Sequence, residues 1–333
     1  MSDWRPGANL DILRERARLN ADIRAFFALR GVLEVETPLL CSSAATDLHL
    51  AAFAIEGKGL LRPLFLQTSP EFAMKRLLAA GSGPIYQLGK AFRAGDISAR
   101  HNPEFTILEW YRPGFTLPAL MDEMEALLLA TAGSAAAEQI IPGVATAFAR
   151  CERTTYRALF ETRFGINPHT ADAAMLRTLV LRETTFGDAA ALDAVACLDL
   201  LFAMLIEPSL GHVQPVFVFD FPALQASLAR VIVNDDGDRV AARCEVYMRG
   251  MELANGYLEL ADAIEQRCRF VADNAARAAR GLPEIPLDER LLAALAAGLP
   301  ECSGIALGVD RLLLLRTGAA SIDAVLAFAS PQA

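Results

Sequence analysis

The stretch FRAGDISARHNPEFTILEWYR, residues 92–112, decides the fold. An apolar run from Ile85 leads into it as a strand, a polar loop follows, and a second strand begins at Glu104. The pattern predicts an antiparallel hairpin with a long connection. Strand alternation gives the second strand two faces, which carry Phe105, Ile107, Glu109 and Tyr111 on one side and Glu104, Thr106, Leu108 and Trp110 on the other.

The first of these faces combines aromatic rings with a carboxylate and a phenol. Arg93 ends the preceding strand, and the loop adds Arg100, His101 and Asn102. Guanidinium groups beside an aromatic shelf suit a nucleotide, because the ring can stack while the phosphates accept bidentate hydrogen bonds. The same residues also fit a surface hairpin whose Arg and Glu side chains pair with each other. The hairpin alone leaves both interpretations open.

The segments outside the hairpin predict an α+β fold, with a mixed antiparallel sheet and helices on one side, rather than a doubly wound sheet. Residues 116–240 are rich in Ala and Leu and are interpreted as a largely helical insertion in a single domain that spans residues 1–333. The remaining elements are predicted from periodicity and from Gly and Pro signals. They are helices at 10–30, 71–81, 257–280 and 288–297, and strands at 33–36, 64–67, 216–222 and 244–256.

Two further segments carry groups that bind phosphate or metal. In GMELANGYLELAD (250–262), Glu252 and Glu259 bracket a turn signal, so both carboxylates could face one cavity and bind Mg²⁺ beside phosphates. In GIALGVDR (304–311), glycines permit close backbone approach, and a helix that begins near Val309 would direct its amides and Arg311 at an anion. Taken singly, the first segment also fits a solvated pair of acids, and the second fits a packed helix entry.

Composition excludes several classes of protein. The 31 Lys and Arg against 40 Asp and Glu give a net charge of −9, which disfavours a nucleic acid as the main partner of the surface. Apolar runs are too short for a membrane span, which needs about 18 residues, and the charged N-terminus does not resemble an export signal. We therefore expect a cytoplasmic protein. The cysteines lack C-x-x-C spacing and are expected to be buried free thiols: Cys41, Cys151, Cys197, Cys244, Cys268 and Cys302.

Read in order, RGVLEVETP (30–38), the hairpin and GIALGVDR resemble the three motifs of the class II aminoacyl-tRNA synthetase catalytic domain. TSPEFAMKRLLAAG (68–81) and ELANGYLELADAIEQ (252–266) match the lysyl-tRNA synthetase branch, and the resemblance runs from about Leu10 to Leu315. The first motif lies so near the N-terminus that no anticodon-binding OB domain is expected. The chain is similar to a truncated family, the elongation factor P (R)-β-lysine ligases. That family activates an amino acid with ATP and passes it to a lysine ε-amine of elongation factor P.

The resemblance implies a role for each motif residue. Arg93 and Arg311 would be the catalytic residues that hold the α- and γ-phosphates, and Glu252 and Glu259 would lie near Mg²⁺. The ATP site would be completed by Ala94, Gly95, His101, Asn102, Phe105 (stacked on adenine), Glu252, Leu253 and Gly308. The amino-acid substrate, (R)-β-lysine or lysine, would contact Ser69, Pro70, Glu71, Glu109, Tyr111 and Glu259. The first motif would also form the interface of a homodimer.

Two residues depart from the synthetase pattern. The second motif usually reads Arg-x-Glu, whereas Gly95 stands at the glutamate position here, so adenine recognition would rest on backbone groups or on Asp96. Ala306 replaces a glycine of lysyl-tRNA synthetases, and its methyl group would alter which isomer fits, in favour of an amino group on the β-carbon.

Two alternative functions stay open at this point. One is a free-standing lysyl-tRNA synthetase, although tRNA is an unlikely acceptor for so acidic a chain. The other is a non-catalytic regulatory paralogue. Retention of both phosphate arginines and both acids argues against the second alternative.

Overall fold

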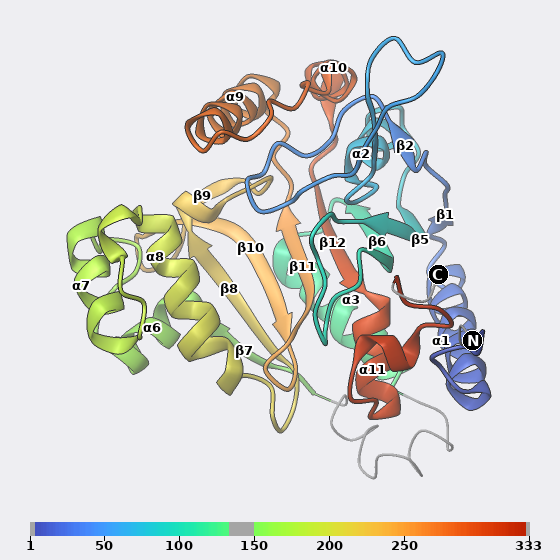
Figure 1. Ribbon diagram of the computed structural model, residues 1–333, viewed down its shortest axis with the longest axis horizontal. Helices are drawn as coiled ribbons and strands as arrows, with labels where there is room; N and C mark the ends of the chain where they lie inside the picture. Colours follow the sequence, from blue (N-terminus) through green and yellow to red (C-terminus); the bar gives the residue numbers. More distant parts are fainter. Residues whose placement is uncertain (1–3, 133–149, 331–333) are drawn as a thin grey trace.

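A nine-stranded sheet organises the chain in the computed structural model, which describes residues 4–132 and 150–330 (Figure 1). Its order is β1-β5-β6-β12-β11-β10-β8-β7, with β9 beside β10; β1/β5 and β7/β8 are parallel and the other pairs antiparallel. The strands are β1 (Leu33–Glu34), β5 (Ile85–Phe92), β6 (Glu104–Pro113), β7 (Glu152–Thr155), β8 (Val216–Pro222), β9 (Val231–Val233), β10 (Arg239–Tyr247), β11 (Glu252–Leu258) and β12 (Cys302–Gly308). A small second sheet has the order β2-β4-β3 and contains β2 (Leu40–Cys41), β3 (Ala54–Ile55) and β4 (Leu64–Leu66).

Helices cover the sheet in three groups (Figure 1). The first group is α1 (Leu10–Ala28), α3 (Leu117–Ala130) and α11 (Val309–Thr317); the second is α2 (Glu71–Ala79), α9 (Ala263–Ala279) and α10 (Glu289–Gly298); the third is α6 (Tyr156–Phe164), α7 (Ala173–Glu183) and α8 (Ala194–Leu201). Short helical turns occupy Ala189–Ala191, Phe202–Ile206, Glu207–Ser209, Ala223–Gln225 and Ile322–Val325. The predicted α+β class is therefore confirmed.

The β5–β6 hairpin is present as predicted, with a register that runs from Ile85 opposite Tyr111 to Phe92 opposite Glu104. The predicted alternation also holds, because Leu108 and Trp110 are buried in the main core, which they share with Phe27 of α1 and with α3 and α11. The Trp110 ring lies edge-on to Phe27 at 5.4 Å between centroids. One face of this hairpin is thus committed to packing, and the other face is free to build a site.

The sequence prediction fails around β11. The expected strand at 244–256 is a hairpin of β10 and β11, whose turn places Arg249 and Gly250 at positive φ, and the helix expected from Tyr257 begins at Ala263. Asn255-Gly256 has the composition of a turn but lies inside β11. Gly256 is required there by close packing, since a Cβ atom would lie 2.9 Å from Cβ of Ile305 on the neighbouring strand.

Several other predicted segments differ in extent. The predicted 33–36 strand is reduced to β1, while the 64–67 and 216–222 strands and the 10–30 and 71–81 helices match β4, β8, α1 and α2 closely. In the 116–240 stretch, α3 packs into the main core and β8 extends the main sheet, and residues 133–149 lie outside the described residues. Of the six cysteines, four are buried, but Cys41 is half-buried and Cys268 is exposed. None of the described helices combines the length and apolar character that a membrane crossing requires.

A buried ion cluster joins the first and last helices to α3. Arg316 on α11 is 1% exposed and donates to Glu15 and Asp22 of α1 and to the carbonyl of Thr131, at 3.1–3.3 Å. Because burial removes water from these charges, each depends on its partners for compensation. The cluster therefore fixes how α1 and α11 pack together.

We expect Arg316→Ala to destabilise the protein by about 3 kcal/mol, because it removes the buried guanidinium that Glu15, Asp22 and the Thr131 carbonyl share. The free energy of unfolding in urea measures the effect. The matched control is Arg14→Ala, which breaks the exposed helical pair with Asp11 and should change the free energy of unfolding by less than about 1 kcal/mol. Equal losses in the two variants would contradict the assignment.

Candidate active site

A cavity of about 1280 Å³ opens on the face of β6, β11 and β12 that is turned away from the main core. Its wall is completed by the loop at 42–50, by the start of α2 and by residues of α8, α9 and β10. The cavity brings together Arg93 and Arg311, the two predicted phosphate-binding residues. It is also lined by Ser69, Pro70, Glu71, His101, Asn102, Phe105, Glu109, Tyr111, Glu252, Leu253, Glu259 and Gly308, whereas Ala94 and Gly95 are not among its lining residues.

Arg311 is held at one end of this cavity by groups from two different segments. Its Nη1 donates to the carbonyl of Glu252 at 2.7 Å, and its Nη2 donates to Nε2 of His101 at 2.6 Å. Since Nε2 of His101 accepts, its Nδ1 carries the proton and donates to Oγ of Ser98 at 2.7 Å. Burial and the neighbouring Arg311 lower the pKa of His101. The imidazole is therefore a neutral support that orients the Arg311 guanidinium.

Arg93 directly follows β5, and its side chain lies over the ring of Phe105 on β6, which is the aromatic shelf predicted for the hairpin. Its guanidinium carbon is 5.0 Å from the centroid of the Phe105 ring, a cation–π distance. Its backbone N–H donates to the carbonyl of Pro103 at 2.8 Å, which closes the base of the loop. The buried Nε of Arg93 has no hydrogen-bond partner among the described residues. The free Nε–H of the guanidinium could donate to a phosphate, and the neighbouring Phe105 ring could stack on a nucleotide base.

The loop itself explains two of the predicted residues differently. The side chain of Asn102 is occupied within the protein, because its Nδ2 donates to the Glu104 carbonyl at 2.6 Å and its Oδ1 accepts from the backbone N–H of Ser330 at 3.0 Å. Gly95 has a φ of +85°, a conformation that favours glycine. A glutamate at position 95 would therefore strain the backbone. The neighbouring Asp96 lines the cavity instead.

The other end of the cavity is strongly acidic. Glu71, Glu109 and Glu259 surround the buried ammonium of Lys75, whose Nζ lies 2.6 Å from a carboxylate oxygen of Glu71 and 2.6 Å from one of Glu259. Burial alone would lower the pKa of Lys75, but the two carboxylates outweigh it and raise that pKa. Three carboxylates against one ammonium leave a formal excess of two negative charges, which attracts a substrate with two ammonium groups.

The pKa values of these acids show how little water reaches them. Burial raises the pKa of Glu109 to about 7, with the charge of Glu71 adding to the rise. Burial likewise raises the pKa of Glu259 to about 8, opposed by the ammonium of Lys75. A bound cation would stabilise the ionised forms of both acids and reverse these shifts. Binding of an ammonium ligand would therefore stabilise this pocket.

Hydrogen bonds fix the position of Glu109. Tyr111 donates its hydroxyl to one carboxylate oxygen at 2.6 Å, and Ser69 donates to the other at 3.0 Å. The Ser69 hydroxyl also accepts from the backbone N–H of Glu71 at 3.0 Å, which ties the pocket to the start of α2. Gly304 on β12 keeps the pocket open, since a Cβ atom there would collide with the Tyr111 ring and lie 2.7 Å from Oε1 of Glu259.

The structure separates the two acids that were expected to share Mg²⁺. Glu252 begins β11, whereas Glu259 follows its end, so the extended strand places them about 20 Å apart along the chain. Glu259 belongs to the acidic pocket. The β10–β11 register places Glu245 opposite Asn255 and Glu252 opposite Tyr247. Burial raises the pKa of Glu245, the charge of Arg243 opposes the rise, and the charge of Glu252 adds to it. The turn at Asn255-Gly256 on which this pair rested is absent, because both residues lie inside β11, and the pair as Mg²⁺ ligands stays a prediction.

Glu252 could hold a hydrated Mg²⁺, whereas Glu245 is occupied by hydrogen bonds from Arg243, Tyr247 and Asn255. Among residues 4–132 and 150–330 no cluster of three or more His, Cys, Asp or Glu side chains could enclose a metal. Mg²⁺ needs only one or two carboxylates when waters and substrate phosphates supply its other ligands. Both acids line the cavity, and Glu252 borders Arg311 with an oxygen 3.8 Å from Nη1.

Sequence reasoning missed Arg243, Glu245, Asn255 and Tyr257, which line the cavity, and Lys75, which contacts the cavity residues Glu71 and Glu259. Lys75 had a signal, because it follows Glu71 by four residues on a helix and therefore lies on the same face. Asn255 and Tyr257 follow Leu253 at the two-residue period of a strand, which the predicted turn concealed. Glu245 had no local signal, since only the strand pairing brings it near Glu252.

Comparison with known proteins agrees with this geometry. The family of class II tRNA synthetases (D, K and N) matches residues 1–332. The chain is 49% identical over 340 residues to the elongation factor P (R)-β-lysine ligase of Vibrio cholerae, with 100% of this chain and 99% of that one covered. It is 47% identical to the proteins of the same name from Proteus mirabilis, over 98% of both chains, and Sodalis glossinidius, over 100% of both. The chain therefore belongs to the class II tRNA synthetase family (D, K and N), in the branch whose members are named elongation factor P (R)-β-lysine ligases.

Proposed function

We propose that this protein activates (R)-β-lysine with ATP as an aminoacyl adenylate and transfers it to the ε-amine of a lysine on elongation factor P. The observation that carries the proposal is the acidic pocket, whose excess of two carboxylates matches the two ammonium groups of a lysine isomer. The full-length similarity to proteins named for this reaction supports the acceptor. The protein itself would act in the cytoplasm.

The first step is in-line attack of the substrate carboxylate on the α-phosphorus of ATP. A P–O bond forms to the carboxylate, and the bond to pyrophosphate breaks. Arg93 would hold the α-phosphate, and Phe105 beside it would stack on the adenine. Arg311, which His101 orients, would hold the γ-phosphate. Little proton transfer is needed, so catalysis comes from positioning and from neutralising the phosphate charge.

The remaining roles follow from the same geometry. Glu252 would hold Mg²⁺, which would supply charge neutralisation on the phosphates when it is bound. Glu71 would pair with one substrate ammonium, while Glu109, Tyr111 and Glu259 would enclose the other. Ala306 lies opposite Glu109 in the β12–β6 register, so its methyl group shapes the floor of this pocket. Asp96, rather than Gly95, would approach the adenine.

We also propose that the protein is a homodimer through the segment that follows α1. Leu29, Leu33 and Leu40 are 85%, 56% and 43% exposed there, and β1 forms an edge of the main sheet. Exposed leucines along a sheet edge favour pairing with another copy of the chain. A lysyl-tRNA synthetase remains the second candidate function, because the acidic pocket would also accept α-lysine; aminoacylation of tRNA by the pure protein would favour it.

Replacement of Arg311 should abolish adenylate formation. We expect Arg311→Ala to reduce ATP–pyrophosphate exchange with (R)-β-lysine by roughly a hundredfold to a thousandfold, because a guanidinium that neutralises transition-state charge is lost. The melting temperature should stay close to that of the unmodified protein. Arg267→Ala, which removes an exposed arginine paired with Glu289 outside the cavity, is the matched control and should exchange normally. Normal exchange by a folded Arg311→Ala protein would refute the assignment.

The methyl group of Ala306 should favour the β-amino acid. We expect Ala306→Gly to shift the ratio of kcat/KM for α-lysine over (R)-β-lysine upward by roughly tenfold, since one methyl group in a packed pocket discriminates on that scale. Pyrophosphate exchange with each isomer measures the ratio. An unchanged ratio would show that Ala306 does not select the isomer, and a stronger preference for α-lysine in the unmodified protein would contradict the proposed substrate.

Replacement of Glu252 and replacement of Glu259 should affect different components of the exchange reaction. We expect Glu252→Gln to raise the Mg²⁺ concentration for half-maximal exchange by roughly tenfold, because a charged ligand is lost. Glu259→Gln should instead raise the KM for (R)-β-lysine and leave the Mg²⁺ requirement unchanged. The two variants serve as controls for each other. The reverse pattern would support Glu259 as a metal ligand.

A further inference from the structure

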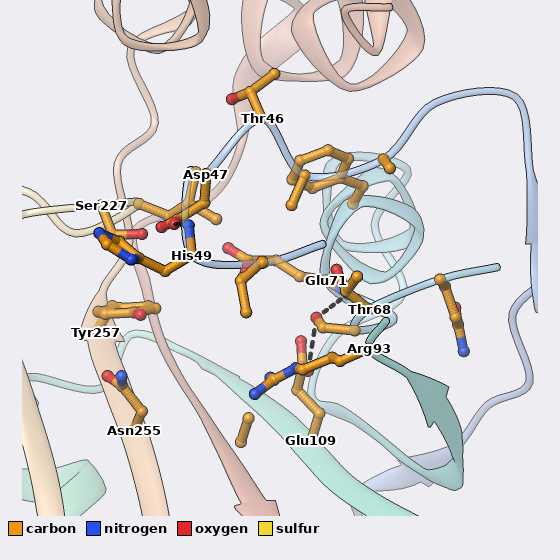
Figure 2. A pocket seen from close by; sticks show the side chains of 18 of the residues that line it. Thr46, Asp47, His49, Thr68, Glu71, Arg93, Glu109, Ser227, Asn255 and Tyr257 are labelled. Atoms are coloured by element: carbon orange, nitrogen blue, oxygen red, sulfur yellow. Dashed lines mark hydrogen bonds between the residues drawn. The ribbon is translucent and has the colours of Figure 1, made fainter. Parts of the chain in front are cut away.

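The second step of the proposed reaction requires a base, and His49 is placed to act as one. His49 lies on the loop at 42–50 and lines the cavity, with an exposed side chain at the cavity edge. Its ring has no hydrogen-bond partner within the described part of the chain. Figure 2 shows Asp47 and His49 on the loop that crosses the pocket near Glu71, with Asn255 and Tyr257 on the strand across from them. An incoming side chain can therefore reach this imidazole.

The loop that carries His49 is anchored to the second helix group. Thr46 donates its hydroxyl to Asp273 of α9 at 2.7 Å, and Ser43 donates to Asp288, the N-cap of α10, at 3.0 Å. The backbone N–H of His49 itself donates to Oδ1 of Asp47 at 2.7 Å. Arg277 of α9 also donates to the Asp47 carbonyl, at 3.3 Å. The backbone of His49 is thus held in place while its side chain stays unengaged.

Other candidate bases in the cavity are already engaged. His101 is bound at both ring nitrogens by Arg311 and Ser98, and Glu109 accepts from Ser69 and Tyr111. Glu71 and Glu259 flank the ammonium of Lys75, and Glu245 accepts from Arg243, Tyr247 and Asn255. Imidazole is also the side chain best matched to proton transfer near neutral pH.

We propose that His49 accepts a proton from the ε-amine of the acceptor lysine as that amine attacks the adenylate. The inference deepens the proposed function and rests on it. The acceptor ammonium releases one proton to water before the attack. The amine lone pair then forms a C–N bond to the adenylate carbonyl carbon, His49 takes the second proton, and the C–O bond to AMP breaks with its electron pair on AMP. The product is an amide, and His49 returns its proton to water.

Carboxylates lie near His49. Burial raises the pKa of Asp199 on α8, while a hydrogen bond from Gln225 and the charge of His49 oppose the rise. The charged side chains that line this part of the cavity are Asp47, Glu71, Asp199, Arg243, Arg269 and Asp273.

The test separates the two half-reactions in His49→Gln. We expect pyrophosphate exchange with (R)-β-lysine to stay within about twofold of the unmodified protein, while single-turnover transfer from the preformed adenylate to elongation factor P slows by about a hundredfold. The defect should shrink as pH rises, because hydroxide can then take the second proton in place of His49. Release of the adenylate by hydroxylamine should remain normal, because its adduct is acidic enough to lose that proton to water. His212→Gln, whose ring contacts the Pro208 carbonyl outside the cavity, is the matched control.

Each outcome decides the inference. Slow transfer with normal exchange and normal hydroxylamine release supports His49 as the base. Transfer at the normal rate refutes it, and an equal loss of exchange and transfer shows that His49 serves substrate binding instead. If the unmodified protein exchanges pyrophosphate with (R)-β-lysine but does not load elongation factor P, the proposed acceptor is wrong, and the inference fails with it.

Discussion

The site depends on one buried ammonium shared by carboxylates. Lys75 is 2% exposed and contacts both Glu71 and Glu259, which come from α2 and from the end of β11. Without this cation the neighbouring acids would be still harder to ionise, because burial and mutual repulsion favour their neutral forms. Lys75 therefore balances one acid and leaves the charge of the others for a ligand. It also fixes α2 against the sheet at the place where the substrate would lie.

The hairpin was predictable because its signals are local. Apolar alternation on β6 separates the packing face from the cavity face, and the structure confirms both Leu108 and Trp110 in the core and Glu109 and Tyr111 in the cavity. Most of the residues that the motifs indicated line a single cavity, because the motifs lie at strand ends and helix starts beside that cavity. Their detailed roles were less predictable. Asn102, for example, holds the chain near Ser330 with the amide oxygen that an ATP contact would require.

The errors arose where a local signal had a nonlocal cause. Asn255-Gly256 resembles a turn, yet the glycine is there because Ile305 on β12 approaches too closely for a side chain. That one misreading moved the start of α9 and merged β10 with β11. Glu245 is seven residues from Glu252 along the chain, and the tight turn between β10 and β11 brings the two acids together. Such pairings depend on strand register, which a single sequence does not specify.

The cavity divides according to the chemistry of the two steps. Adenylate formation moves charge but hardly any protons, so rigid cations suffice, and the structure accordingly ties Arg311 to His101 and to the Glu252 carbonyl. Amide formation must remove protons from the acceptor, which enters from outside and so meets the edge of the cavity first. A base for that step cannot be buried with the acids around Lys75, because its pKa would be coupled to theirs. An exposed imidazole on an anchored loop lies at the edge of the cavity and away from the buried acids. One cavity can therefore shield the reactive adenylate from water and still admit the hydrated ammonium of the acceptor lysine.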